Sequence, residues 1–421
     1  MEARKGCCHR VVTIPPFGRH VYAATCLVSM GRSLRSDFTD TTMFSSAHLS
    51  PARDSLLFTP GPLTTSLQVK QAMLHDAGSW HADFNAVVAS VRGRLLGLAG
   101  VSSGTGWTVI PLQGSGTFGV EAVFQSCVPP QGKVVVLTNG AYGDRIVQIL
   151  EHASIDHVVL ATAEDTPAEP ETLEECLEAD KTVTHVAVVH CETTTGLLNP
   201  ISALGQVAKC HDKVFIVDAM SSFGGMPIDF EGCGIDFLVS SSNKCIEGVP
   251  GFSFIFCRGE VLLACEGWAR SLSLDLLGQL QGFERNGQFR FTPPTHVMLA
   301  FDQALRELEA EGGVAARHER YVRNHTTLMV GMRGLGFRPY LDPSVQSPII
   351  TTFQYPTSEF DFSGFYRALS ERGFIIYPGK LTRVNTFRIG NIGRLFPADM
   401  EQLVHAIGVV AQATRGGSPN P

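Results

Sequence analysis

Short apolar runs alternate with amphipathic stretches through the middle of the chain. Runs of strand length that are apolar at most positions cover residues 107–112, 133–137, 157–160, 185–190, 214–217, 235–239 and 252–256. Such runs are typical of strands buried on both faces, and residues 120–127, between two of them, have a helical pattern. The alternation predicts an α/β fold with a parallel sheet covered by helices, in which the run 252–256 returns from the strand before it.

The pattern differs on either side of this region. Residues 69–98 predict a largely helical stretch, and the chain after the sheet predicts two long helices, 298–310 and 314–333, broken at Gly312-Gly313. Three strands, 349–353, 374–377 and 386–389, and two amphipathic helices follow. The apolar face of the last helix holds Met400, Leu403, Val404 and Ile407. We therefore expect a large domain over 53–295, connecting helices over 296–333 and a small C-terminal α+β domain over 334–421.

Residues 1–52 have a different composition and are set apart from the fold as a leader. Six basic residues stand against three acidic ones, and serine and threonine are frequent. An arginine-rich, acid-poor leader is typical of a mitochondrial transit segment. The apolar stretch 21–30 also suits a signal-peptide core. The third interpretation is a disordered extension without a targeting function. We expect an intracellular protein, mitochondrial if the leader is a transit segment.

Composition limits the partners of the chain. A net charge of -7 and 17% charged residues give no reason to expect nucleic acid or an anionic membrane, and no apolar run approaches the roughly 18 residues that span a bilayer. The 11 cysteines are scattered without a Cys-x-x-Cys pair, so we expect neither a disulfide framework nor a zinc site. We assign no metal, because His190-Cys191-Glu192 also lacks metal-ligand spacing.

A lysine follows the predicted strand 235–239 in the run Ser240-Ser241-Ser242-Asn243-Lys244. Open α/β sheets build their ligand sites where parallel strands end. A lysine that loses solvent there has a lowered pKa, which frees its amine for Schiff-base chemistry. The other interpretation of Lys244 is a solvated surface residue at a strand end.

A glycine-rich turn joins a predicted strand to a predicted helix. Residues 114–119 match G-x-G-x-x-G, so a dinucleotide site must be considered. That site needs an acid at the end of the next strand, where the chain has Thr138-Asn139 instead. The hydroxyls of Ser115 and Thr117, with the amides at the helix start, suit a single phosphate better.

Two further strand ends carry candidate chemistry. Asp218 follows the strand 214–217 and is either a loop cap or a buried acid that holds a proton on a heteroaromatic nitrogen. Tyr142 lies in a predicted glycine-rich loop and is either a ring that stacks on a planar cofactor or a partly exposed tyrosine. Phosphate cup, stacking aromatic, acid and lysine in this chain order indicate a pyridoxal phosphate site.

The same combination resembles the class V branch of the fold-type-I pyridoxal phosphate aminotransferases. The resemblance runs from about residue 56 to residue 407 and omits the leader. It implies a large domain with a mixed, mainly parallel sheet and a smaller C-terminal α+β domain. The motifs that carry it are residues 59–64, 113–118, 139–143, 190–196, 218–225, 242–245 and 289–296.

The resemblance implies a role for each matching residue. Lys244 would hold pyridoxal 5′-phosphate covalently, Asp218 would pair with its ring nitrogen, and Tyr142 would stack on the ring. The residues implied around the phosphate and the ring hydroxyl are Ser115, Gly116 and Thr117, with Asn243 or Ser242 nearby, Thr292 from the second subunit of a homodimer, and Thr193 or Thr194.

The substrates that the resemblance implies are 2-aminoethylphosphonate and pyruvate, with Arg388 as the arginine that receives their anionic group. Candidates for distinguishing a phosphonate from a carboxylate are Arg285, Arg290 and Arg394. Within the same fold, an alanine–glyoxylate or serine–pyruvate aminotransferase is the alternative. From a different class, a dinucleotide-dependent oxidoreductase rests on the glycine pattern alone.

Overall fold

A seven-stranded sheet forms the centre of the protein in a computed structural model that describes residues 54–381 and 384–416. Its strand order is β2-β10-β9-β8-β5-β3-β4. Strand β10 is antiparallel to both of its neighbours, and the strands from β9 to β4 are all parallel, so the predicted returning strand is confirmed. The strands are β2 Trp107–Gln113, β3 Lys133–Thr138, β4 Asp156–Ala161, β5 His185–Val189, β8 Val214–Asp218, β9 Phe237–Ser241 and β10 Phe252–Arg258.

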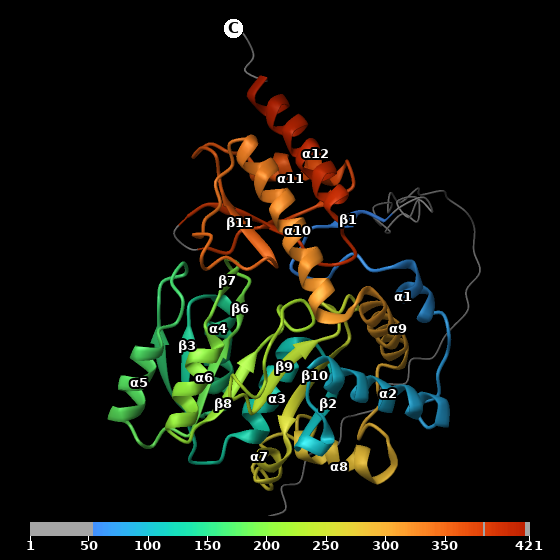
Figure 1. The fold of residues 1–421 in the computed structure, drawn as a ribbon, viewed down its shortest axis with the longest axis vertical. Helices are drawn as coiled ribbons and strands as arrows, with labels where there is room; N and C mark the ends of the chain where they lie inside the picture. The colour runs from blue at the N-terminus through green and yellow to red at the C-terminus, as the bar shows by residue number, and fades with distance from the viewer. Residues whose placement is uncertain (1–53, 382–383, 417–421) are drawn as a thin grey trace, which may run out of the picture. The chain divides into compact units, whose positions relative to one another are not determined.

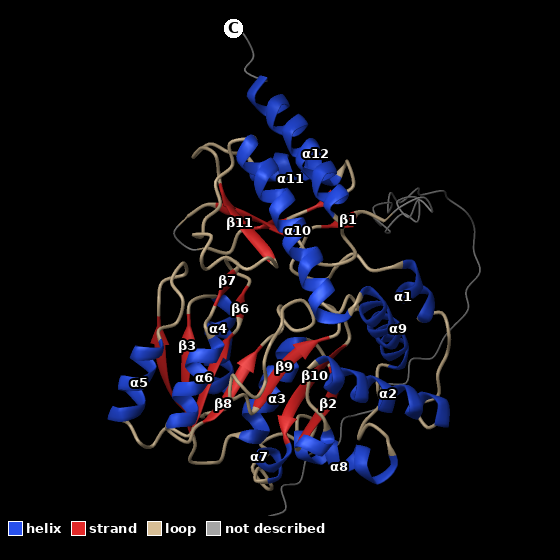
Figure 2. Ribbon diagram, viewed as in Figure 1, coloured by secondary structure: helices blue, strands red, loops and turns tan. Residues whose placement is uncertain are grey.

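Helices connect the strands and pack against the sheet (Figures 1 and 2). Helix α3 packs on β9 and β10, α4 on β3 and β4, and α6 on β8, while α2 and α8 contact β2. The sheet is buried because its strands are apolar on both faces, as in β5, where every residue is buried. These helices are α2 Ala82–Leu98, α3 Gly116–Cys127, α4 Ala141–His152, α5 Pro170–Ala179, α6 Ile201–Cys210 and α8 Leu276–Asn286.

A second, smaller sheet has the order β11-β14-β13 and its own apolar core. Helices α10, α11 and α12 contribute to that core, which is rich in phenylalanine: Phe353, Phe365 and Phe387 are fully buried there. Strand β1 at the beginning of the described chain pairs with β12, so the first residues pack with the last part of the fold. The elements are β1 Leu56–Leu57, β11 Ile350–Gln354, α11 Phe362–Ser370, β12 Phe374–Ile375, β13 Tyr377–Pro378, β14 Thr386–Gly390 and α12 Pro397–Gly416.

Two long helices join the sheets. Helix α9, Thr295–Glu311, packs on α1, Leu67–Ala72, and on α2, while α10, Gly313–Gly334, packs on α12. The predicted break between the helices is confirmed, since Gly312 has a φ of 109° and Gly313 a φ of 75°. These left-handed values suit glycine because a Cβ would clash with the backbone. Residues 53–421 form one unit, and the exact domain boundaries stay a prediction.

The structure corrects three local predictions. The stretch 69–98 is two helices, α1 and α2, because the chain turns over residues 73–81 and His81 caps α2 through its ring nitrogen. The run 374–377 is split between β12 and β13, which pair in different sheets. Tyr142 lies in the first turn of α4 and not in a loop, because Gly140 is already the residue that caps the helix.

The remaining described elements are short: η2 Ser103–Thr105, β6 Cys191–Glu192, β7 Leu197–Leu198 and α7 Gly259–Leu263. Among the helices that the structure describes, none has the length and apolarity that a membrane span requires.

Candidate active site

The parallel strands bring the predicted chemistry to one edge of the large sheet. Strands β3, β5, β8 and β9 point the same way, so the segments that follow them lie at the same edge. Asp218 ends β8, and Lys244 follows β9, its direct neighbour. The charges of Tyr142 and Asp218 both act on Lys244, so these three predicted residues lie near one another.

The Lys244 amine is confined by the chain segment that follows β1. Its Nζ donates a hydrogen bond of 2.6 Å to the Pro60 carbonyl oxygen. Gly61 has a φ of 119°, and a Cβ there would lie 2.6 Å from the Lys244 Nζ, so no side chain fits between them. Burial lowers the pKa of Lys244 because it disfavours the ammonium form, although the negative charges of Tyr142 and Asp218 oppose this effect.

The loop that carries Lys244 is held from helix α10. Arg317 Nη1 donates to the carbonyl oxygen of Cys245 at 2.6 Å, and the Tyr321 hydroxyl also donates to that oxygen. Glu247, two residues further on, has a φ of 66° and accepts from both Arg320 at 2.7 Å and Tyr321 at 2.8 Å. A buried network of charges therefore positions the lysine through its own loop.

Asp218 is buried and has no charged partner in direct contact among the described residues. Its Oδ1 accepts a hydrogen bond of 2.9 Å from the Met220 amide. Burial raises the pKa of Asp218 to about 6, since a charge without solvent is costly, and the nearby Glu192 adds to the increase. The positive charges of Lys244 and Arg145 act in the opposite direction. Such a carboxyl group favours a cationic ligand in front of it.

The predicted phosphate cup is the start of helix α3. Ser115 is the N-cap residue, but its side chain makes no capping hydrogen bond, so the hydroxyl is free of that role. Gly114 has a φ of 115°, and a Cβ on Gly116 would lie 2.3 Å from the Met220 sulfur. Thr117 Oγ1 accepts a hydrogen bond of 3.2 Å from Arg145 Nη1. The glycines thus bring the helix amides close to Asp218's loop, where an anion is favoured by the helix dipole.

Glu192 holds the start of helix α4, which has no side-chain cap of its own. Its Oε2 accepts from the amides of Tyr142 at 3.1 Å and Gly143 at 3.3 Å, while its Oε1 accepts from the Thr194 hydroxyl at 2.7 Å. This carboxylate therefore places Tyr142 and Thr194 together. Burial of Tyr142 would raise its pKa, but the charges of Lys244 and Lys380 prevail and lower it.

Arg388 enters the same edge from the smaller sheet. It lies in β14, is 2% exposed, and donates from Nη1 to the Thr193 carbonyl oxygen at 2.8 Å and from Nε to the Pro378 carbonyl oxygen at 3.0 Å. No carboxylate forms an ion pair with it in the described part of the chain. Burial lowers the pKa of Arg388. A buried guanidinium held only by neutral oxygens is suited to an anionic ligand.

The other predicted residues are placed less centrally. Ser242 is fully buried and donates its hydroxyl to the Val249 carbonyl oxygen at 2.6 Å, which leaves Asn243 as the better candidate near the phosphate. Thr292 is exposed, and its carbonyl oxygen accepts from Gln113 at 2.8 Å. Arg290 is bound to Asp275 at 3.0 Å.

Of the remaining arginine candidates, Arg394 lies over the Phe396 ring in a separate pocket with Glu307 and Glu311. Arg285 lies in the last turn of α8. Within one chain, no described contact connects these two residues, or Arg290, to the residues around Lys244.

Sequence reasoning missed the functional setting of Glu192, Arg145 and Lys380. In the sequence, Glu192 was considered only as a metal ligand and rejected for its spacing. In the structure it is the last residue of strand β6, as Asp218 is of β8, and such a strand-end position was a signal for a functional residue. The Arg145 guanidinium carbon lies 5.0 Å from the centroid of the Tyr142 ring, and the Lys380 Nζ lies 4.8 Å from it. A signal for Arg145 was its position one helical turn after Tyr142; Lys380 lies in a loop, where no periodicity applies.

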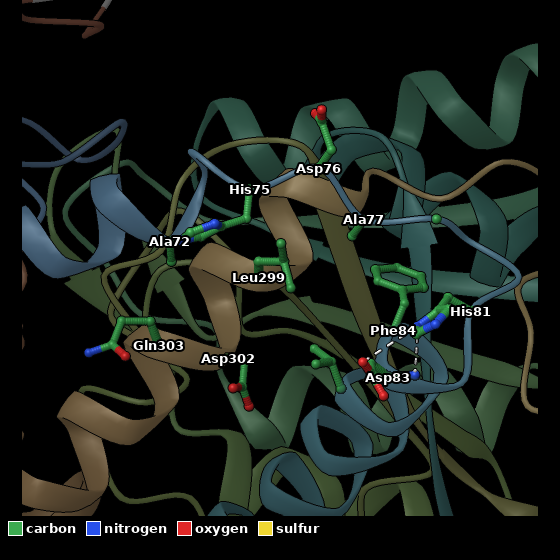
Figure 3. A pocket seen from close by; sticks show the side chains of 12 residues that line it. Ala72, His75, Asp76, Ala77, His81, Asp83, Phe84, Leu299, Asp302 and Gln303 are labelled. Carbon is green, nitrogen blue, oxygen red and sulfur yellow. Dashed lines mark hydrogen bonds and ion pairs between the residues drawn. The ribbon is translucent and has the colours of Figure 1, made fainter.

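A larger pocket of about 680 Å³ lies elsewhere, between the α1–α2 connection and α9 (Figure 3). Figure 3 shows His75 and His81 from the connection and Asp302 from α9 around it, with His81 paired to Asp83. In the described residues, no group of His, Cys, Asp and Glu has the arrangement of a metal site. Because this pocket lacks both a lysine and a phosphate cup, we place the chemistry at Lys244.

Comparisons with known proteins identify the family. Residues 74–388 match the family model "Aminotransferase class-V". The chain is 52% identical over 362 residues to a 2-aminoethylphosphonate–pyruvate transaminase of Phocaeicola vulgatus, covering 86% of this chain and 100% of the relative. It is 53% identical over 353 residues to the Bacillus cereus protein of the same name, covering 84% of this chain and 96% of that protein.

Solved structures share the fold. A ureidoglycine–glyoxylate aminotransferase from Bacillus subtilis has a TM-score of 0.79 at 23% identity, covering 87% of this chain and 95% of that one. An alanine–glyoxylate aminotransferase from Nostoc has a TM-score of 0.79 at 25% identity, covering 85% and 96%. The expected fold-type-I architecture is thus confirmed.

The curated relatives named above are bacterial, and nothing in the comparisons supports the mitochondrial address expected of residues 1–52, which lie outside the described residues. A family match over most of the chain, a shared fold and a lysine–aspartate pair at one sheet edge lead to the same assignment. The chain belongs to the class-V aminotransferase family.

Proposed function

We propose that the protein is a pyridoxal 5′-phosphate enzyme that transfers the amino group of 2-aminoethylphosphonate to pyruvate, giving phosphonoacetaldehyde and L-alanine. The observation that carries the proposal is the identity of 52% to transaminases of that name from Phocaeicola vulgatus and Vibrio vulnificus, over 100% and 96% of their lengths. The site residues support it, because they supply what the cofactor and an anionic substrate need.

The sheet edge fits the cofactor on three counts. Asp218 is buried without an ion-pair partner in the described chain, and a protonated ring nitrogen would supply the missing cation. Helix α3 begins with Ser115, Gly116 and Thr117, whose amides and hydroxyls suit a phosphate group. The Lys244 amine, with its lowered pKa, is suited to an aldehyde.

Each residue then has a chemical task. When bound, the cofactor supplies a conjugated ring that accepts electrons from the bond broken at the amine-bearing carbon. With the cofactor bound, Lys244 would hold it covalently, and its Nζ would then serve as the base that moves the proton of the amine-bearing carbon. Asp218 would keep the ring nitrogen protonated, and Tyr142 would stack on the ring.

The binding roles follow the same geometry. We assign the phosphate to Ser115, Gly116, Thr117 and Asn243, and the ring hydroxyl to Thr193 or Thr194. Arg388 binds the anionic group of each substrate in turn, since pyruvate enters after phosphonoacetaldehyde has left. The Thr193 and Pro378 carbonyl oxygens fix the guanidinium and leave its remaining N–H groups for the ligand.

A homodimer completes the proposed site, with Thr292 of one subunit at the phosphate of the other. Large apolar side chains are exposed near the residues that would meet a second copy: Trp80 is 78% exposed, Phe118, beside the phosphate cup, 52%, and Phe291, beside Thr292, 42%. Such exposure on a folded chain indicates a surface that a partner covers. The pocket in Figure 3 is lined by Gly78 and His81, which flank Trp80 in the sequence, and would belong to that interface.

An intracellular location is part of the proposal. The eight cysteines in the described residues are all free, and six of them are buried. Burial raises the pKa of Cys191 to about 12, so this thiol stays protonated beside the site and does not compete with Lys244 as a nucleophile.

A donor screen tests the proposed function. The purified protein is supplied with the cofactor and pyruvate, and alanine formation is measured with 2-aminoethylphosphonate and with a panel of amino acids. We expect 2-aminoethylphosphonate to be the preferred donor. Preferential turnover of alanine with glyoxylate would instead establish the alternative function within the same family.

The Lys244→Ala variant tests the site itself. Because one amine both anchors the cofactor and moves the proton, we expect activity to fall beyond the roughly 10²–10⁴-fold loss of an ordinary acid–base group. Borohydride treatment followed by mass spectrometry should attach the cofactor to Lys244 in the wild type and to no lysine in the variant. Lys181→Ala, at an exposed lysine after α5, serves as the control. A cofactor adduct on the Lys244→Ala protein would disprove the assignment.

A further inference from the structure

The two substrates of the proposed reaction present their anionic groups differently. The carboxylate of pyruvate is bonded directly to the reacting carbon, whereas the phosphonate of 2-aminoethylphosphonate lies one methylene further away and carries up to two negative charges. A single arginine matches the smaller charge. A phosphonate placed further from the reacting carbon calls for a second cation, further from the centre of the site.

Lys380 is placed to be that cation. It lies in the loop between β13 and β14, and its Nζ is 4.8 Å from the centroid of the Tyr142 ring. The side chain thus extends over the site, although the residue as a whole is exposed. Among the described residues, Lys380 has no hydrogen-bond or ion-pair partner, so no carboxylate accounts for its position.

The backbone before Lys380 is held closely against β14. The Gly379 amide donates a hydrogen bond of 2.9 Å to the Thr386 carbonyl oxygen. A Cβ on Gly379 would lie 2.2 Å from the Thr386 Oγ1 and 2.4 Å from its carbonyl oxygen, so a larger residue would push this hairpin apart. Arg388, two residues after Thr386 on the same strand, faces the same site. The residue before Lys380 is therefore held next to the strand that carries Arg388.

The charges around Tyr142 agree with this arrangement. Lys244, Lys380 and Arg388 all act on the Tyr142 hydroxyl and favour its ionised form. The two carboxylates of the site are bound elsewhere: Glu192 to the amides that begin α4, and Asp218 to the Met220 amide. Arg388 is 2% exposed and Lys380 is exposed, so one cation lies deep in the site and the other at its rim.

We propose that Lys380 is the residue that selects a phosphonate over a carboxylate. Its ammonium binds the outer oxygen atoms of the phosphonate, while Arg388 binds the inner ones, and the carboxylate of pyruvate is bound by Arg388 alone. This inference rests on the proposed function. It replaces Arg285, Arg290 and Arg394 as candidates, since Arg290 is already paired with Asp275 and Arg394 lies in another pocket.

Two inert probes separate the two anionic groups. Ethylphosphonate and propionate carry the same ethyl group on their anionic group, lack the reacting amine and keto groups, and differ in charge. Their binding to the holoenzyme is measured by isothermal titration calorimetry in the wild type, Lys380→Met, Lys380→Arg, Arg388→Gln and the distant control Lys181→Met. In parallel, the Michaelis constants are determined for pyruvate and for the phosphonate donor.

We expect Lys380→Met to weaken ethylphosphonate about tenfold, the effect of losing one charge-assisted hydrogen bond, with little change for propionate. The Michaelis constant for the phosphonate donor should rise, while the constant for pyruvate stays the same. Lys380→Arg should restore most of the phosphonate binding because it keeps the charge. Arg388→Gln should weaken both probes, and Lys181→Met neither.

Other outcomes would overturn the inference. Equal weakening of both probes by Lys380→Met would make Lys380 a general source of positive potential. Loss of cofactor affinity in that variant, with unchanged probe binding, would make it a support for the Tyr142 ring. If the wild type does not use 2-aminoethylphosphonate, the proposed function itself is wrong. If the wild type uses it and Lys380→Met behaves like the wild type, the proposed function stands and only the role given to Lys380 is wrong.

Discussion

At the scale of single residues, we expect the buried Asp218 carboxyl group to favour cofactor binding and to lower the stability of the cofactor-free protein. In the cofactor-free chain, burial raises its pKa from 3.8 to about 6. Below the pKa of the unfolded chain, Asp218 is protonated in both states, and its full contribution to the free energy of unfolding is present. As the pH rises through the pKa of the folded chain, this contribution is lost, because the unfolded chain ionises first. At about 1.36 kcal/mol per pKa unit, the loss approaches about 3 kcal/mol. Cofactor-free Asp218→Asn should therefore be more stable than the wild type at about pH 8 and similar at about pH 4.

Urea unfolding at the two pH values measures this difference, and groups common to both proteins cancel in the comparison. Asp236→Asn is the control, because the Asp236 carboxylate is equally buried but accepts from Lys209 at 2.8 Å, so its loss should destabilise the protein at about pH 8. Cofactor affinity should fall in Asp218→Asn. An unchanged stability difference between about pH 4 and about pH 8 would show that folding does not raise the pKa of Asp218.

At the scale of elements, helix α10 connects the lysine loop to the smaller sheet. Arg320 donates to Glu247 at 2.7 Å and to the carbonyl oxygens of Gly393 and Leu395 at 2.7 and 2.8 Å, and Arg317 Nη1 lies 3.3 Å from Glu247. Glu247 and both arginines are at most 3% exposed. Glu247→Gln keeps the shape but leaves Glu311 as the one carboxylate paired with the two arginines in the described chain, so one buried positive charge loses its partner. We therefore expect a loss of about 3–5 kcal/mol in the free energy of unfolding.

An ion pair with a solvent-exposed arginine provides the control for Glu247→Gln in denaturant unfolding. Arg306 is 56% exposed and pairs with Asp302 at 3.0 Å within helix α9. Arg306→Gln should cost less than about 1 kcal/mol, because the guanidinium is largely solvated and Asp302 keeps Arg94 as a second partner at 3.7 Å. A similarly small effect for Glu247→Gln would mean that the network contributes little to holding the lysine loop.

At the scale of the whole molecule, the exposed apolar residues predict a dimer. Trp80→Glu places a charge on a surface that the second copy would cover, so we expect monomers in analytical ultracentrifugation and weaker cofactor binding, because Thr292 of the partner would be lost from the phosphate. Val330, 70% exposed on α10, gives the control. A dimer that survives Trp80→Glu and dissociates with Val330→Glu would place the interface on the other side.

The strands and the main site residues could be predicted from the sequence. Strands buried on both faces need apolar side chains at nearly every position, so β5 and β9 are visible as continuous runs. Parallel strands end at one edge, which brings Asp218 and Lys244 together without knowledge of the fold in detail. Local turn chemistry is harder to predict: the His81 ring caps a second helix within one helical stretch, and Gly140 starts helix α4 before Tyr142.

The sequence by itself determined the α/β class, the strand-end chemistry and the family resemblance, because these depend on short-range patterns and on residues near one another in the chain. Tertiary structure alone decided that β1 pairs with β12, that Arg317 and Arg320 hold the lysine loop, and that Lys380 reaches Tyr142. Those contacts join segments far apart in sequence. Their partners are chosen by packing and by the need to pair buried charge, for which no periodicity exists along the chain.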